Sequence, residues 1–136
     1  MKLAFDIESG DFASAGKASS QIKQVLKQLQ VDPKTIKRIV VAVYEAEVNV
    51  VAHSVGGTLT ANITESEIVV VVVDRGPGIV NIELAMKAGF STASKEVREM
   101  GFGAGMGLPN IKKNTDDLKI ESRVGEGTTL TFRNAF

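Results

Sequence analysis

The chain has 136 residues, 43% of them hydrophobic, with 16 basic and 16 acidic side chains, no cysteine and one histidine. This composition predicts one globular domain, residues 1–136, with a core of its own. It excludes disulfides and a multi-histidine zinc site, and the balanced charge argues against a direct nucleic-acid surface. The N-terminus is too polar for a signal peptide and no apolar run reaches the length of a membrane span, so we expect a cytoplasmic protein without membrane contact.

The first half of the chain predicts one strand followed by two helices. Leu3, Phe5 and Ile7 alternate with Lys2, Ala4 and Asp6, as in a half-buried strand. Apolar residues recur at helical spacing from about 12 to 29. Asp32 and Pro33 then suit the N-cap and first position of a second helix, which is expected to run for about five turns.

The second half of the chain predicts two hairpins. Residues 58–64 and 68–74 are expected to form the first, with a turn at 65–67. Its second strand holds five consecutive valines, which favours a central strand covered on both faces. Residues 118–124 and 128–132 are expected to form the other hairpin.

Helices are expected between the hairpins, at residues 81–88 and 108–114, with an irregular glycine-rich segment at 89–107. Strands therefore cluster along the chain and do not alternate strictly with helices. This order favours the α+β class, a two-layer α/β sandwich with a mixed, mostly antiparallel sheet covered by helices.

Glu45 and Asn49 lie four residues apart in the second predicted helix and so point to the same side, which His53 extends by one turn. A carboxylate and an amide one turn apart can hold a hydrated divalent cation and polarise a hydroxyl. Asn49 lies among valines, where an unpaired amide is costly to bury. His53 alternatively ends the helix as a cation opposing its dipole. Glu47, about 200° around the helix from Glu45, is expected to be a solvated carboxylate.

Glycine patterns mark three further sites. Asp74-x-Gly76-x-Gly78 follows the valine strand and suits either a ligand that approaches bare backbone or a tight turn. Alternating glycines at 101–107 run into a helix, where backbone N–H groups can cradle phosphates; a disordered loop is the alternative. Residues 125–128, Gly-Glu-Gly-Thr, are by themselves a hairpin turn.

Two better-known nucleotide motifs do not fit. Gly10 and Gly16-Lys17 have five residues between the glycines where a P-loop has four, and Ala18 replaces the Ser or Thr that contacts magnesium. The glycines of 101–107 do not match G-x-G-x-x-G, and no predicted strand leads directly into them.

Taken together, the motifs resemble in order and spacing those of the GHKL (Bergerat-fold) ATPases, over residues 30–132. Within that superfamily they most resemble the bacterial anti-sigma factor serine/threonine kinases and the related stress-signalling switch kinases. The matching motifs are Glu45-x3-Asn49-x3-His53, Asp74-x-Gly76-x-Gly78, Gly103-x-Gly105-x-Gly107 and Gly127-Thr128, together with residues 89–92 and 103–109.

The resemblance implies ATP and Mg²⁺ as cofactors, with a role for each matching residue. Asn49 would coordinate Mg²⁺ through its side-chain oxygen, while the phosphates and water supply other ligands. Glu45 would be the catalytic base that accepts the proton of the attacking hydroxyl. Asp74 would hydrogen-bond the adenine amino group, with Thr128 supporting it.

The remaining nucleotide contacts that the resemblance implies are Gly76, Gly78 and Ile79 at the adenine, and Gly103, Gly105, Met106 and Gly107 in a lid over the phosphates. One position departs from the pattern, because the anti-sigma serine kinases have an arginine where this chain has Gly103. Such an arginine is worth ~10³–10⁵ in rate. Arg98, Lys95 and Lys112 are the cations that could replace it.

The resemblance implies a kinase that phosphorylates a STAS-like anti-sigma-antagonist protein. It also implies binding to a sigma factor through the first helix and its surroundings, and formation of a homodimer. The alternative is a protein-binding regulatory module that uses ATP only as a conformational ligand, with little or no transfer. A histidine-kinase catalytic domain ranks last, since the chain contains no phospho-acceptor helix.

Overall fold

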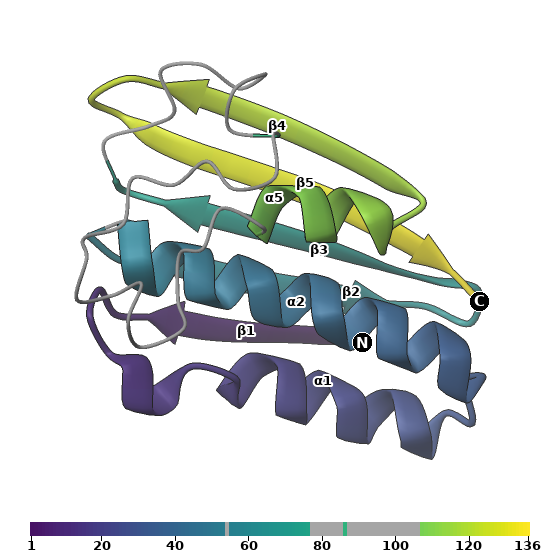
Figure 1. Ribbon diagram of the computed structural model, residues 1–136. Coiled ribbons are helices and arrows are strands. Elements are labelled where there is room, and N and C mark those ends of the chain that lie inside the picture. The colour runs from purple at the N-terminus through teal and green to yellow at the C-terminus, as the bar shows by residue number, and fades with distance from the viewer. Residues whose placement is uncertain (54, 77–85, 87–106) are drawn as a thin grey trace.

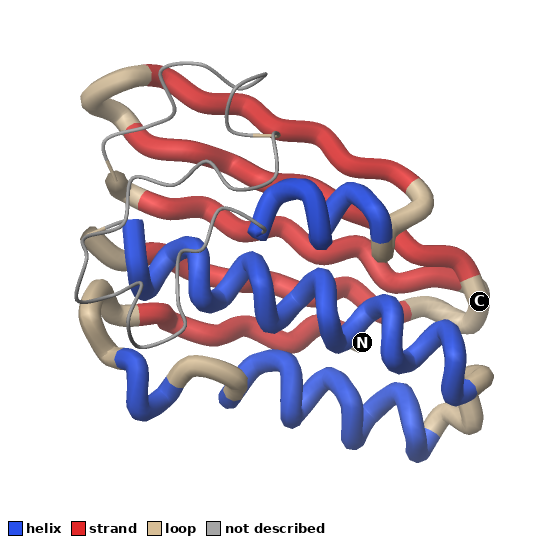
Figure 2. The backbone as a smooth tube through the Cα atoms, in the orientation of Figure 1, coloured by secondary structure: helices blue, strands red, loops and turns tan. Residues whose placement is uncertain are grey.

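The computed structural model describes residues 1–53, 55–76, 86 and 107–136. Figure 1 shows the sheet with the described α-helices along one of its faces, and Figure 2 shows the two layers by element type. The described strands are β1 (Lys2–Ile7), β2 (Gly57–Ile63), β3 (Glu67–Asp74), β4 (Asp117–Arg123) and β5 (Gly127–Ala135). The described helices are the 3-10 turn η1 (Phe12–Ser14), α1 (Lys17–Gln28), α2 (Pro33–His53) and α5 (Gly107–Lys113).

The two-layer α+β fold is confirmed, and so are the two predicted hairpins. The strand order is β1-β2-β3-β5-β4. Each of the four neighbouring pairs is antiparallel, where a mixed sheet was expected. The helix expected at 81–88 and the irregular segment at 89–107 lie outside the described residues, apart from Met86 and Gly107.

α2 is the centre of the helix layer, with α1 on one side of it and α5 on the other. Its buried stripe includes Ile39, Ala42, Val43 and Ala46, each with no exposed surface. The predicted start of α2 is confirmed, because Asp32 Oδ2 accepts hydrogen bonds from the backbone N–H groups of the next turn.

The valine strand β3 is central, as predicted, but the helices of the described part of the chain cover only one of its faces. Val70 and Val72 point into the helix layer and are buried, whereas Val73 is 43% exposed on the other face. The prediction of cover on both faces was therefore wrong. Continuous hydrophobic runs fit strands buried on both sides, but β-branched residues also suit the open face of an antiparallel sheet.

The first helix begins later than predicted. Residues 12–14 form a separate 3-10 turn, and α1 starts only at Lys17. Gly16 has φ 99°, a left-handed conformation that interrupts the helical path before α1 and favours glycine. Part of the apolar periodicity from residue 12 therefore belongs to a loop that packs on the core.

Candidate functional site

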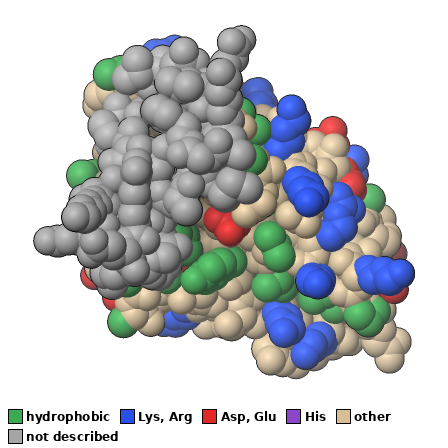
Figure 3. Space-filling view, in the orientation of Figure 1, with side chains coloured by type: hydrophobic (Ala, Val, Ile, Leu, Met, Phe, Trp, Pro, Cys, Tyr) green, Lys and Arg blue, Asp and Glu red, His purple; other side chains and the backbone are tan. Residues whose placement is uncertain are grey.

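The site begins with two polar side chains on α2. Glu45 and Asn49 are both half-buried, one turn apart in the C-terminal half of the helix. The side chain of His53, at the end of α2, lies outside the described residues. In Figure 3 an acidic group shows on the helix face beside the grey atoms, close to a group of hydrophobic side chains.

The beginning of α5 lies against Glu45. A Cβ atom added to Gly107 would stand 3.6 Å from Glu45 Oε2. Asn110 Nδ2, one turn further along α5, donates a hydrogen bond of 3.4 Å to Glu45 Oε1. The tertiary structure thus brings together the Glu45 carboxylate and the last of the alternating glycines of residues 101–107. Asn110 was not predicted. Its only signal in the sequence is its spacing of three from Gly107, which places both on one side of a helix.

Asp74 lies at the end of β3, on the face that the helices cover. In the sheet register it stands between Gly57 of β2 and Thr128 of β5. Its side chain is half-buried, and Oδ1 accepts a 2.8 Å hydrogen bond from the backbone N–H of Gly76. This bond orients the carboxylate, and Oδ2 accepts no hydrogen bond from the described residues.

Thr128 and Ser122 extend this row across the sheet. Thr128 is 6% exposed, and its Oγ1 lies 2.8 Å from Ser122 Oγ on the neighbouring strand β4. Ser122 Oγ also lies 3.2 Å from the carbonyl oxygen of Gly127 and donates to it. Ser122 was not predicted, because one serine in an alternating strand carries no distinctive signal. The apolar rows of the sheet therefore end in a polar row that crosses β3, β5 and β4.

Two glycines hold the backbones of this row close together. A Cβ on Gly57 would collide with the carbonyl oxygen of Val73, and a Cβ on Gly127 with that of Asp74. Gly127 also has φ 118°, which strains any other residue. The hairpin-turn interpretation of residues 125–128 is confirmed, and the turn also sets Thr128 beside Asp74.

Glu47 is not the solvated carboxylate that we predicted. It is 3% exposed and accepts three backbone hydrogen bonds at the start of α1. These bonds come from the N–H groups of Gly16 at 3.2 Å, Ala18 at 3.1 Å and Ser19 at 2.9 Å. The side of α2 opposite Glu45 faces α1, so a carboxylate there meets the positive end of that helix dipole. The same contact fills the place where a P-loop would bind phosphate.

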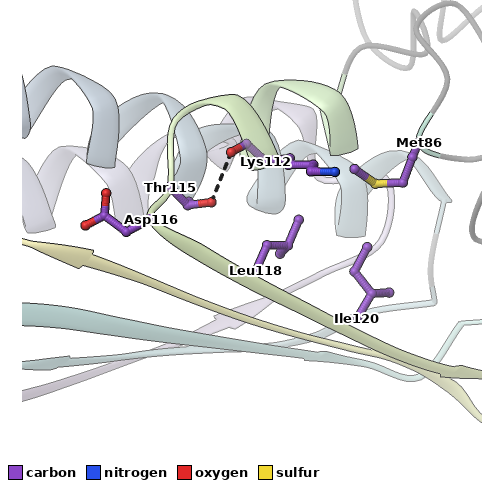
Figure 4. Close-up of a pocket in the computed structure, with 6 residues that line it drawn as sticks. All are labelled: Met86, Lys112, Thr115, Asp116, Leu118 and Ile120. Carbon is purple, nitrogen blue, oxygen red and sulfur yellow. Dashed lines mark hydrogen bonds between the residues drawn. The ribbon is translucent and has the colours of Figure 1, made fainter.

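A pocket of about 410 Å³ lies between α5 and the edge strand β4 (Figure 4). Leu118 and Ile120 of β4 point from the sheet toward α5, and Lys112 extends toward Met86. Lys112 is two residues beyond Asn110 and therefore about 200° around α5 from it. Since Asn110 contacts Glu45, Lys112 points away from Glu45.

The rest of the predicted site lies outside the described residues. This applies to Gly78, Ile79, Gly103, Gly105 and Met106, and also to the two other candidate cations, Lys95 and Arg98. Among the described residues, no helix is both long and apolar enough to pass through a membrane.

Comparison with known proteins gives a consistent result. Residues 9–134 match the family described as histidine kinase-like ATPase domain. The chain is 36% identical over 108 residues to an anti-sigma F factor of Caldanaerobacter subterraneus subsp. tengcongensis, covering 74% of this chain and 72% of that protein. It is 30% identical over 112 residues to the serine/threonine-protein kinase RsbT of Bacillus subtilis, covering 79% and 78%.

Solved structures share the fold at low identity. A crystal structure of the RsbU and RsbW domains of a Mycobacterium tuberculosis protein matches with a TM-score of 0.66 at 19% identity, covering 98% of this chain and 32% of that one. The structure of the SiaB–SiaC complex from Pseudomonas aeruginosa matches with a TM-score of 0.56 at 13% identity, covering 98% and 89%.

Proposed function

Because the chain belongs to the histidine kinase-like ATPase domain family, we propose that it binds ATP with Mg²⁺ and transfers a phosphoryl group to a serine or threonine of a regulatory protein. The observation that carries this proposal is the meeting of α2 and α5, where Glu45 Oε2 faces the helix start at Gly107. A base beside a helix N-terminus suits a reaction that takes a proton from a hydroxyl next to phosphate.

The described residues fit the two cofactors. Asp74 offers a carboxylate oxygen that can accept a hydrogen bond from the amino group of adenine. The glycines Gly57 and Gly127 flank Asp74 and have no side chain to block a flat ring. The Asn49 side-chain oxygen is the hard ligand that Mg²⁺ prefers. When bound, ATP would supply the phosphoryl group and Mg²⁺ would neutralise its charge.

The protein's own residues would then do two things. Asn49 would hold the metal on α2, and Glu45, one turn before it, would accept the proton of the attacking hydroxyl. Phosphoryl transfer depends mainly on positioning and charge stabilisation. Two residues on one rigid helix would position the metal and the attacking hydroxyl relative to each other.

The helix layer also supports a protein partner with an acidic surface. Apart from Glu45 and the buried Glu47, α1, α2 and α5 contain no acidic residue. Figure 3 shows basic side chains gathered over the part of the helix face away from the grey atoms. The cations of these helices are Lys17, Lys23, Lys27, Lys34, Lys37, Arg38, Lys112 and Lys113.

The names of the relatives suggest the class of partner. One is an anti-sigma factor and another is a serine/threonine kinase. We therefore propose a STAS-like anti-sigma-antagonist as the phosphoryl acceptor and a sigma factor as a second ligand, both meeting α1 and the neighbouring basic face. A homodimer is part of the same proposal.

The test is phosphoryl transfer from labelled ATP to purified antagonist proteins in the presence of Mg²⁺. We expect phosphoserine or phosphothreonine on an antagonist, formed much more slowly in Glu45→Gln and at the wild-type rate in Glu65→Gln, which changes an exposed carboxylate on the β2–β3 turn.

A second candidate is a binding module in which ATP only changes conformation. The position of Lys112 favours it, since this cation lines the pocket on the far side of α5 from Glu45. This function predicts tight ATP binding, partner binding that depends on ATP, and no phosphorylated product. It also predicts that Glu45→Gln leaves partner binding unchanged.

A further inference from the structure

Three asparagines link the sheet to Glu45 through α5. Asn134 Nδ2, on β5, donates a 2.8 Å hydrogen bond to the carbonyl oxygen of Asn114. Asn114 Nδ2 donates a 2.8 Å bond to the carbonyl oxygen of Asn110. Asn110 Nδ2 then donates to Glu45 Oε1 at 3.4 Å. The chain of contacts begins in the sheet and ends on the proposed base.

The first member of this chain is unusual for its place in the core. Asn134 has no exposed surface, lies on the helix-covered face of β5 next to Phe132 in the alternating pattern, and its Oδ1 has no hydrogen-bond partner among the described residues. A buried acceptor without a partner reduces stability, so an apolar residue would pack there at lower cost. Asn134 does, however, satisfy the carbonyl of Asn114 just beyond α5, where the helix leaves carbonyls without internal partners.

The far end of the chain distinguishes the two oxygens of Glu45. Oε1 receives the Asn110 amide, whereas Oε2 faces the start of α5 at Gly107. A glutamate side chain has several rotamers, and a hydrogen bond on one oxygen restricts them.

We propose that Asn110 is a positioning residue that holds the Glu45 carboxylate with Oε2 turned toward the phosphoryl-transfer site, and that Asn114 and Asn134 hold α5 in the register this needs. The role rests on the proposed function, since it orients the base of that reaction. Asn110 itself touches neither substrate nor nucleotide in this scheme.

The first test compares kcat of phosphoryl transfer with ATP affinity measured without the acceptor protein. We expect Asn110→Ala to lower kcat about tenfold, because a tenfold change corresponds to ~1.4 kcal/mol, the scale of a hydrogen bond to a charged group. ATP affinity should change by less than about twofold, because Asn110 does not contact ATP in the proposed complex. Asn62→Ala, at an exposed position of β2, is the control and should change neither.

A double-mutant cycle separates positioning from a general structural effect. Adding Asn110→Ala to Glu45→Gln should cause no further loss of kcat, because the residue that it orients is already gone. An additional tenfold loss, or equal losses of kcat and ATP affinity in the single variant, would overturn the assignment.

The contact has a test that does not need kinase activity. The side-chain amide resonances of Asn110 in NMR spectra should shift between the wild type and Glu45→Gln, and should keep their wild-type positions in Glu65→Gln. An Asn110 amide that does not respond to Glu45 would refute the positioning role even in an active kinase. If the wild-type protein transfers no phosphate but its Asn110 amide resonances respond to Glu45, the proposed function is refuted. The contact that orients Glu45 would then stand without a catalytic role.

Discussion

Glu47→Gln tests how α1 is attached to the rest of the protein. The wild-type carboxylate accepts three backbone N–H groups, from Gly16, Ala18 and Ser19. Glutamine retains one oxygen, which can keep the bond from Ser19, but it turns an NH₂ group toward the other two donors. Two bonds to a charged acceptor are worth ~3–6 kcal/mol in total. A neutral amide is less costly to bury than a carboxylate, which offsets part of this loss.

We therefore expect Glu47→Gln to reduce the free energy of unfolding by about 2–3 kcal/mol, which is a fall of roughly 10 °C in Tm for a domain of this size. Urea unfolding at pH 7 measures the change, and hydrogen exchange should show lost protection at residues 16–19. Glu65→Gln, on the exposed β2–β3 turn, is the matched control. If both variants unfold at the same urea concentration, the buried contact does not anchor α1 as argued.

Three further predictions concern the polar row and the strand ends. Gly127→Ala should lower the free energy of unfolding in urea by about 2–5 kcal/mol and abolish ATP binding, because φ is 118° and the new Cβ collides with the backbone carbonyl of Asp74. The control Gly125→Ala, with φ 83° and open space around it, should lower it by only ~1–2 kcal/mol and still bind ATP. Thr128→Val keeps the side-chain shape but removes the hydroxyl, so the Kd for ATP should rise about fivefold in titration calorimetry. Thr129→Val, on the open face, should leave this Kd unchanged. Equal changes in the two variants would show that the Thr128 hydroxyl does not support ATP binding. The pKa of the Asp116 carboxyl is lowered, chiefly by a hydrogen bond from a backbone N–H of β5. Its contribution to stability is therefore present above the unfolded-state pKa of about 3.9 and is lost as pH falls through the lower folded-state pKa. Asp116→Asn should narrow the difference between the urea midpoints at pH 7 and pH 2, and an unchanged difference would contradict this origin of the pH dependence.

The two halves of the proposed site lie on different elements of the fold. The adenine half of the proposed site rests on strand ends, where Asp74 and Thr128 are held by the sheet register. The transfer half rests on helix packing, where Glu45 meets α5. Of the two cations of α5, Lys112 lies on the far side of that helix from Glu45. Experiments on the two halves should therefore be interpreted independently.

Features set by neighbouring residues could be predicted from the sequence. The N-cap at Asp32, the turn around Gly125 and the common side of Glu45 and Asn49 all depend on contacts within one or two turns of the chain. The order of the motifs then indicated the family, and the clustering of strands along the chain indicated the α+β class. These features are local, so the spacing of residue types is sufficient to specify them.

Other features depended on which element lies opposite. Glu47 and Glu45 differ by two positions on one helix, yet Glu47 is buried because its side of α2 faces the first turn of α1. The open face of β3 and the asparagine chain from Asn134 to Glu45 likewise follow from packing between distant segments. Periodicity tells which residues share a face, but only the tertiary structure decides whether that face meets solvent, a helix dipole or another side chain, and this decides the role of a polar residue.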